Sequence, residues 1–249
     1  MTVLALSVSL LAGCGSTAAS PVSSAASTAA ESTTSSVVSE ATSAAADENA
    51  AAAAQLLNDL TGSYQELWPV ILADEYKQTW LDDCTALVGE DNAEAAFEKL
   101  SSMVTGDVYG EDAVKAYANG GGAYFCGFTN DLATLTFDGE TSTISGTDKD
   151  GNELFSHPYH YIGMEPVRGL YEFESDDADS GEFTYFFLAP DTSAETYHIE
   201  FRYGSDADAL SQYDAGDYAY WLASGISTDC DQTMIDNCIE LFCTENLAG

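Results

Sequence analysis

Basic residues are scarce in this chain, and their scarcity excludes a large class of partners. Lys and Arg number 6 against 42 Asp and Glu, which gives a formal net charge of -36 at pH 7. Nucleic-acid binding depends on neutralising phosphates with Lys and Arg, so this balance excludes nucleic acid as a partner. Anionic lipid surfaces are disfavoured for the same reason. Cations are the natural partners of so negative a field, although acidity also simply keeps an exported protein soluble.

The motifs of the common enzyme classes are missing as well. The sequence holds no convincing Ser-His-Asp order, no glycine-rich phosphate loop after a strand and no His-Glu-x-x-His, and it has only 3 histidines. Each of these chemistries needs its nucleophile, base or metal ligands at a defined spacing. We therefore expect a binding protein and not an enzyme.

Cysteines at the spacing of a zinc knuckle or a redox motif are also absent, because no C-x-x-C occurs. Besides Cys14, the cysteines are Cys84, Cys126, Cys230, Cys238 and Cys243. Outside the cell they can form disulfides, and their odd number leaves one unpaired or in an intermolecular bond. We interpret them as structural. Pairing Cys230 with Cys238 or Cys243 would join a C-terminal helix to the preceding segment, and the sequence does not choose between the two.

The N-terminal apolar run is too short to span a bilayer and has the features of an export signal. Residues 3–12 are apolar or small, the length of a signal-peptide core. Leu10-Leu11-Ala12-Gly13-Cys14 has the form of a lipoprotein cleavage site, at which a diacylglycerol is attached to the Cys14 thiol. Because Met1 and Thr2 carry no basic charge, we expect the natural start to lie upstream. The alternative is a free Cys14 in a soluble protein.

A tether and one folded domain follow this signal segment of residues 1–14. Residues 15–46 are rich in Ser, Thr and Ala, cannot bury enough apolar surface to fold, and behave as a flexible tether. Residues 47–249 suffice for one domain with a full core, and apolar residues make up 45% of the chain. The order predicts an extracytoplasmic lipoprotein anchored to the cell membrane only through its N-terminal lipid.

The periodicity of the domain changes from helical to strand-like at the three glycines of residues 120–122. Apolar spacing predicts helices at residues 47–60, 76–87, 93–104, 110–118, 206–213 and 228–242. Strand patterns occupy residues 124–129, 132–137, 142–145, 159–164, 169–173, 183–188 and 196–203. Asp138-Gly139 lies between two of these runs, as a hairpin requires. Seven or eight short antiparallel strands predict a closed or nearly closed β-meander.

The segment from residue 167 to residue 204 carries a family resemblance. It contains Arg-Gly-Leu-Tyr-Glu-Phe, then Gly-Glu-Phe-Thr-Tyr after an acidic loop, then Tyr-His-Ile. This order is similar to the ZinT family of bacterial extracytoplasmic zinc-binding proteins, and the resemblance covers roughly residues 56–249. It implies a β-rich α+β fold, a lipocalin-like (calycin) antiparallel barrel with N-terminal helices and a closing C-terminal helix. Tyr64 stands where the family usually has Trp.

The resemblance also implies a metal site with altered ligands. In the ZinT family three histidines bind zinc, one after the strand that follows the acidic loop and two from a His-x-His on the next strand. Matching without gaps places the first on Asp191 and the pair on His198 and Glu200. Alternation puts both members of the pair on one face of the strand, converging on one ion inside the barrel mouth. A shift of two residues would place the pair on Thr196 and His198, leaving one ligand.

The chemistry of such a set is compatible with several ions. One imidazole with two carboxylates suits zinc and also harder ions such as manganese or calcium. A lone His on a strand is also commonly a polar side chain facing solvent or the lumen.

We expect His157 and His160 to be surface residues, because the family does not use these positions. The acidic loop at residues 174–181 lacks the spacing of an EF-hand, so we interpret it as a solvated hairpin tip.

Two functions follow from these patterns. The resemblance implies a surface-anchored lipoprotein that binds a divalent metal ion, zinc first, and buffers it or passes it to an uptake system such as a metal ABC transporter. The alternative is a calycin-type binding module for a small organic ligand or a glycan whose metal site has been lost. The 14 Tyr and 11 Phe residues fit either the filling of a barrel lumen or the lining of an apolar cavity.

Overall fold

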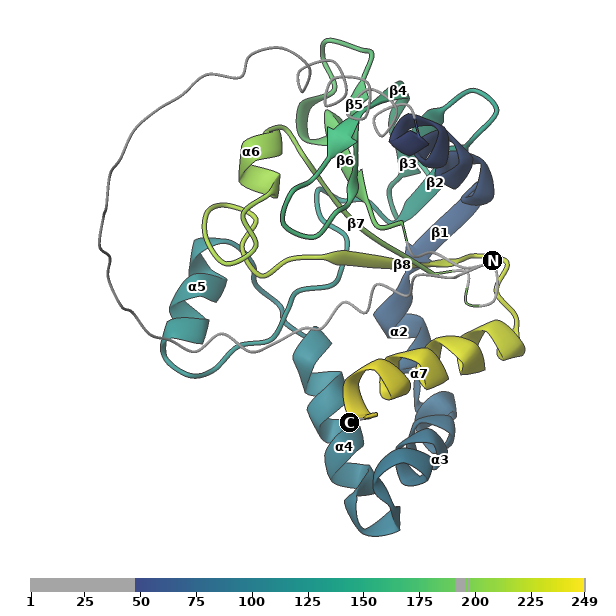
Figure 1. Cartoon of the computed structure of the whole chain (residues 1–249), viewed down its shortest axis with the longest axis vertical. Coiled ribbons are helices and arrows are strands. Elements are labelled where there is room, and N and C mark those ends of the chain that lie inside the picture. The colour runs from purple at the N-terminus through teal and green to yellow at the C-terminus, as the bar shows by residue number, and fades with distance from the viewer. Residues whose placement is uncertain (1–47, 191–195, 197, 249) are drawn as a thin grey trace, which may run out of the picture.

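Eight strands of the chain close into a single antiparallel barrel (Figure 1). The computed structural model describes residues 48–190, 196 and 198–248. The strands pair in chain order, and the first completes the barrel by pairing with the last. They are β1 (Gly62–Glu66), β2 (Thr134–Asp138), β3 (Thr143–Thr147), β4 (Glu153–Met164), β5 (Tyr171–Ser175), β6 (Tyr185–Leu188), β7 (His198–Gly204) and β8 (Ala223–Ser227). The predicted β-rich α+β fold with a lipocalin-like antiparallel barrel is thereby confirmed.

Helices precede, interrupt and close this meander. Residues 48–59 are helical. The further helices are α2 (Leu67–Ile71), α3 (Lys77–Val88), α4 (Glu90–Val104), α5 (Glu111–Ala118), α6 (Ala207–Leu210) and α7 (Gln232–Leu247), with short 3-10 turns η1 (Asp74–Tyr76) and η2 (Gly181–Phe183). The predicted helices are confirmed with shifted bounds, and that at 206–213 is reduced to α6. Among the described residues, no helix is long and apolar enough to cross a membrane.

The prediction differs from the structure at the closure of the barrel. Neither β1 nor β8 was predicted. Strand β1 directly precedes the apolar helix α2. Strand β8 has the sequence Ala-Ser-Gly-Ile-Ser, in which Ile is the single β-branched apolar residue. Residues 124–129 were expected to form a strand but make only isolated bridges, from Phe125 to Thr105 and to Trp221. The Phe125 N–H donates to Tyr220 O, and Leu222 N–H donates to Phe125 O. Residues 124–129 therefore make single hydrogen bonds and isolated bridges to neighbouring segments, and they do not form a strand of the barrel.

Aromatic rings fill the interior of the barrel. Register places Phe186 opposite Tyr203, and their ring centroids lie 5.3 Å apart. Phe201 stacks beside Tyr203 at 5.8 Å. The apolar side of helix 48–59 adds its leucines to the same cluster. The aromatic residues of the meander thus form a packed core, which satisfies one of the two roles expected for them.

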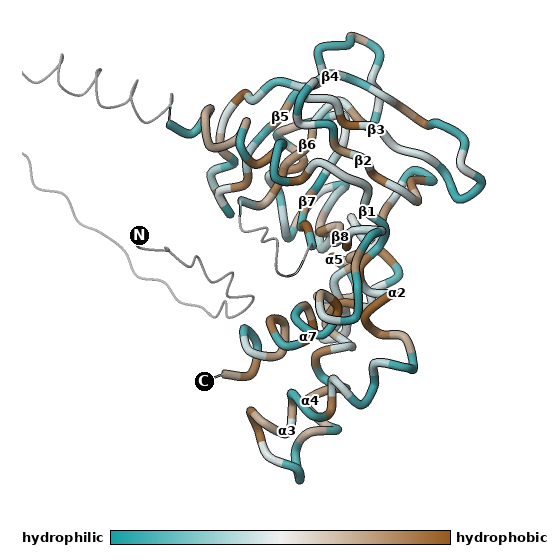
Figure 2. Tube along the Cα trace, turned by 90° about the vertical axis from the view of Figure 1, so that its right-hand side faces the viewer, coloured by the Kyte–Doolittle hydropathy of each residue, from teal (hydrophilic) through white to brown (hydrophobic). Residues whose placement is uncertain are grey.

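A second hydrophobic cluster lies outside the barrel, between α2, α3, α4 and α7. These helices gather at one end of the barrel (Figures 1 and 2). Hydrophobic and hydrophilic residues alternate along α7, as expected for a helix with one buried face (Figure 2). The Asp231 carboxylate caps α7 by accepting the Met234 N–H at 3.0 Å. Trp80 of α3 is fully buried, and its indole N–H donates to Ile71 O at 2.7 Å. The helical layer is therefore fixed against the outer face of the barrel, with Ile226 of β8 in the same cluster.

Candidate binding sites between the barrel and the helices

Strand β7 presents two chemically different faces. Ile199 and Phe201 belong to the core that fills the barrel. His198 and Glu200 alternate with them, and both line a small cavity of about 30 Å³ together with residues of α2 and α7. The prediction that the pair shares one face of its strand is confirmed. The expectation that this face points inside the barrel mouth is wrong, because the apolar members of the alternation take the interior.

The small cavity contains further groups that can donate to a cation. Glu245 and Cys238, both on α7, line it with His198 and Glu200. Thr196 Oγ1 and His198 Nδ1 share a hydrogen bond of 2.6 Å, which orients the imidazole ring. The Cys238 thiol donates to Thr196 O at 3.1 Å. Imidazole, carboxylate and thiol groups therefore line one cavity on the outer face of β7.

Burial keeps the thiol of this group neutral. It raises the pKa of Cys238 to about 12 from an ordinary value of 9.0. A metal ion binds thiolate and not thiol, so Cys238 would have to lose a proton and its bond to Thr196 before it could coordinate. The imidazole and the carboxylates are therefore the donors of this cavity at neutral pH.

The third predicted ligand lies outside the described residues, as does the lipidation candidate. This applies to Asp191 and to Cys14. Within the part of the chain that the structure describes, no three His, Cys, Asp or Glu side chains are arranged to hold a metal ion. His198 and Glu200 thus stand as a pair, and the three-residue site remains a prediction.

The other two histidines contact the acidic loop. His157 Nδ1 lies 2.8 Å from an Asp177 carboxylate oxygen, and His160 Nδ1 lies 2.7 Å from one of Asp176. His160 is exposed, as expected, whereas the His157 side chain is only 18% exposed. The acidic loop is therefore held against β4 by two imidazole–carboxylate contacts and is more than a solvated hairpin tip.

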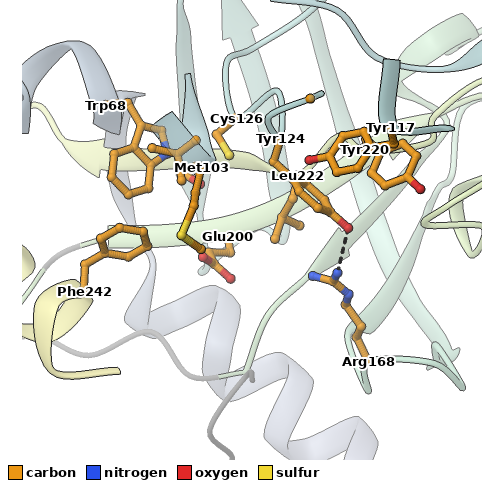
Figure 3. Close-up of a pocket in the computed structure, with 13 residues that line it drawn as sticks. Trp68, Met103, Tyr117, Tyr124, Cys126, Arg168, Glu200, Tyr220, Leu222 and Phe242 are labelled. Carbon is orange, nitrogen blue, oxygen red and sulfur yellow. Dashed lines mark hydrogen bonds between the residues drawn. The ribbon is translucent and has the colours of Figure 1, made fainter. Parts of the chain in front are cut away.

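A larger cavity of about 370 Å³ adjoins the small one (Figure 3). Its apolar lining comes mainly from Trp68, Met103, Tyr117, Tyr124, Tyr220 and Phe242. Trp68, Glu200 and Phe242 line both cavities. The two therefore meet at the outer face of β7, and Glu200 is the acidic residue common to both.

Three tyrosines build one wall of the larger cavity. Tyr117 and Tyr220 stack with ring centroids 3.7 Å apart and planes 6° from parallel. Tyr124 stands edge-on to Tyr220, with centroids 5.7 Å apart. Burial raises the pKa of Tyr117 to about 12, so its hydroxyl stays protonated at neutral pH. Two stacked rings and one edge-on ring thus make this wall aromatic.

Arg168 is the basic residue at this wall (Figure 3). Its Nη2 donates to the Tyr124 hydroxyl at 3.3 Å, and its guanidinium carbon lies 4.2 Å from the centroid of the Tyr213 ring. The buried Glu165 carboxylate holds the turn that carries it, accepting the N–H groups of Val167 at 2.7 Å and Arg168 at 2.6 Å. Arg168 is thus fixed by its backbone, an aromatic ring and a hydroxyl.

Sequence reasoning missed this larger cavity. Its lining residues come from α2, α4, α5, the turn before β5, β7, β8 and α7, which are far apart in the chain. Arg168 belongs to the motif that carries the family resemblance, but nothing in its spacing connects it to Trp68. The one usable signal is the presence of Arg in a chain with so few basic residues.

Comparisons with known proteins bear on the fold. No protein-family model and no curated protein matches the chain. Among solved structures, the chain is similar to the Zn(II)-bound ZinT-like domain of Streptococcus pneumoniae AdcA, with 14% identity, a TM-score of 0.46, and coverage of 72% of this chain and 87% of that one. It is also similar to Zn(II)-bound AdcA from Streptococcus pneumoniae, with 14% identity and a TM-score of 0.44, covering 75% of this chain and 35% of AdcA.

Proposed function

We propose that this chain is an extracytoplasmic, lipid-anchored protein that binds a divalent metal ion, zinc first, through His198 and Glu200. The observation that carries the proposal is that these two side chains share one face of β7 and line the same cavity of about 30 Å³. That volume is close to the share of space that one water molecule occupies, so it suits a single ion and not an organic molecule.

The donor chemistry of the cavity fits such an ion. A metal-bound histidine usually coordinates through one ring nitrogen while a hydrogen bond at the other fixes the ring. The hydrogen bond between Thr196 and His198 Nδ1 would provide that support and leave Nε2 to coordinate the ion. The Glu200 carboxylate supplies oxygen, and Glu245 lines the same cavity. Asp191 is proposed as the third ligand.

The proposed biological setting is based on features of the sequence. Lipidation at Cys14 would hold the domain outside the membrane on its tether. A net charge of -36 attracts cations to the surface and raises their local concentration. We propose that the protein buffers the ion or passes it to an uptake system such as a metal ABC transporter.

Titration calorimetry of the chain from residue 15 onward, with zinc and then with manganese and calcium, tests the proposal. Wild type is expected to bind zinc at one saturable site, and His198→Ala is expected to abolish that site. The matched control is His160→Ala, because His160 is an exposed imidazole that contacts a carboxylate on another part of the barrel. Asp191→Ala should weaken binding about as much as Glu200→Ala. Weak binding at many sites that is indifferent to His198 would mean that the acidic surface merely attracts cations.

A further inference from the structure

Arg168 forms no ion pair with a carboxylate of the described residues. The five ion pairs found there are made by Lys115, Lys149, His157 and His160. The acidic residue nearest along the chain, Glu165, uses its two carboxylate oxygens on backbone N–H groups. The sequence has 42 acidic residues against 6 basic ones. Arg168 thus brings a positive charge to the wall of a cavity that also contains the Glu200 carboxylate, and no described carboxylate is close enough to pair with it.

The guanidinium also has an unused donor. Arg168 Nη1 is buried and, among the described residues, has no hydrogen-bond partner, whereas Nη2 donates to Tyr124. A buried donor without an acceptor is unfavourable, because it has lost its water and gained nothing in return. The planar fork of an arginine matches the two oxygens of a carboxylate. A ligand carboxylate at this position would satisfy Nη1 and neutralise the charge together.

A second donor that is only weakly satisfied lines the same cavity. The buried indole N–H of Trp68 donates to the Cys126 sulfur, which is a weak acceptor, and has no stronger partner within the described part of the chain. Trp68 and Arg168 lie at opposite ends of the cavity in Figure 3. One donor without a partner and one with a weak acceptor, at the two ends of one cavity, fit an elongated ligand with an acceptor at each end.

The space between these donors is apolar and flat. The stacked Tyr117 and Tyr220 form one wall, and Met103 and Phe242 are among the other lining residues. The volume of about 370 Å³ lies within the range of cavities that hold small organic molecules. Flat aromatic walls favour an aromatic body over a flexible chain. Glu200 lines the cavity too, so a second carboxylate on the ligand would be repelled.

We propose that this larger cavity binds a small aromatic monocarboxylic acid, with its carboxylate on Arg168, its ring against the tyrosine wall and its distal acceptor on Trp68 Nε1. The site is distinct from the metal site proposed at His198 and does not depend on it. The two adjoin only through Trp68, Glu200 and Phe242.

The test uses 4-hydroxyphenylacetate as the probe and the chain from residue 15 onward, with EDTA present so that metal plays no part. Titration calorimetry is expected to show one saturable site, and the neutral analogue 4-hydroxyphenylacetamide is expected to bind at least tenfold more weakly. Arg168→Gln should weaken binding of the acid at least tenfold and remove its preference over the amide. His198→Ala, which changes only the small cavity, should leave binding of the acid unchanged.

A second variant tests the proposal independently, in case Arg168→Gln does not fold. Met103→Trp places a larger side chain at the partly exposed edge of the cavity, and it should block the probe while the melting temperature stays near that of wild type. Absence of saturable binding by wild type, equal binding of acid and amide, or full binding by folded Arg168→Gln would each overturn the proposal. Tighter binding of hexanoate than of the aromatic acid would overturn the choice of an aromatic body.

Discussion

Arg168 lies over the ring of Tyr213, with its guanidinium carbon 4.2 Å from the ring centroid. Arg202 of β7 lies over the same ring at 4.4 Å. Burial, with a smaller effect of the nearby Glu165 carboxylate, raises the pKa of Tyr213 to about 12, so the ring stays a neutral phenol. One tyrosine therefore joins the buried arginine of the barrel wall to the arginine of the larger cavity.

Removing the ring of Tyr213 is expected to loosen both arginines. Tyr213→Leu loses two cation–π contacts, each worth about 0.5–2 kcal/mol, so we expect a loss of roughly 1–4 kcal/mol in the free energy of unfolding. Tyr213→Phe keeps the ring and should cost less than about 1 kcal/mol. Urea unfolding of the two variants measures the difference. Equal destabilisation by both would show that the hydroxyl and not the ring is what matters.

Alkaline pH is expected to destabilise the fold through its buried acids. Burial raises the pKa of Cys238 to about 12 from 9.0. Between these values the unfolded chain has released the thiol proton while the folded chain keeps it, so the unfolded state binds fewer protons. The stability from this group is therefore present below pH 9 and is lost as pH rises towards 12, by about 1.4 kcal/mol per pH unit.

Urea unfolding between pH 8 and pH 11 measures this loss. The control is Cys238→Ala, which removes the thiol and should give a shallower decline of the free energy of unfolding above pH 9. Other buried acids, among them Tyr117 and Tyr213, keep part of the decline in that variant, because burial raises the pKa of each to about 12. A slope identical to that of wild type would contradict the assignment to Cys238.

The cysteines differ from the pairing considered on sequence grounds. All five cysteines of the described part are free, and Cys230 is bonded to neither Cys238 nor Cys243. The structure instead brings Cys84 of α3 to Cys243 of α7, with the two sulfur atoms 3.9 Å apart and both residues fully buried. In a disulfide the two sulfur atoms lie about 2 Å apart, so these two thiols are the pair that has to move least among the contacts found.

Refolding in a glutathione redox buffer is expected to join Cys84 to Cys243. Oxidised glutathione would take up the two thiol hydrogens as the disulfide forms, and loop entropy predicts a stabilisation of about 5 kcal/mol for cysteines 159 positions apart. Peptide mapping by mass spectrometry should find the cross-linked peptide, and Cys84→Ala should lack it. A disulfide that contains Cys230 would contradict the arrangement of α3 against α7.

The architecture could be predicted from the sequence, whereas the direction of the candidate metal face could not. Alternation along β7 shows that His198 and Glu200 share a face, but not which face lies inside a closed barrel. The alternate residues Ile199 and Phe201 decide which face lies inside, because they belong to the hydrophobic core that fills the barrel. Strand β8 escaped prediction because its small residues are specified by the barrel and the helices packed on it and not by local propensity.

The larger cavity has no counterpart in any local pattern. Trp68 and Arg168 are 100 positions apart, and only the closure of the barrel and the helical layer bring them to one space. No spacing rule connects such residues, and burial of their donors becomes visible only once the packing is known. The composition shows that basic residues are rare in this chain, but it does not show which cavity Arg168 lines.

Glu200 gives a prediction that joins the two proposed sites, because it lines both cavities. Glu200→Gln removes a carboxylate ligand from the small cavity, so zinc binding should weaken about tenfold or more. The same change removes a negative charge from the larger cavity, so binding of 4-hydroxyphenylacetate should tighten, because the repulsion between the two carboxylates is gone. Opposite changes in the two affinities are the expected result of parallel calorimetric titrations.

The matched control is Glu245→Gln, because Glu245 lines the small cavity and is not among the residues that line the larger one. It should leave binding of the organic acid unchanged, whatever its effect on zinc. If Glu200→Gln weakened both ligands, the carboxylate would act by holding β7 against the helices and not through its charge. If it changed zinc binding alone, the larger cavity would not sense Glu200, and the argument against dicarboxylic ligands would fall.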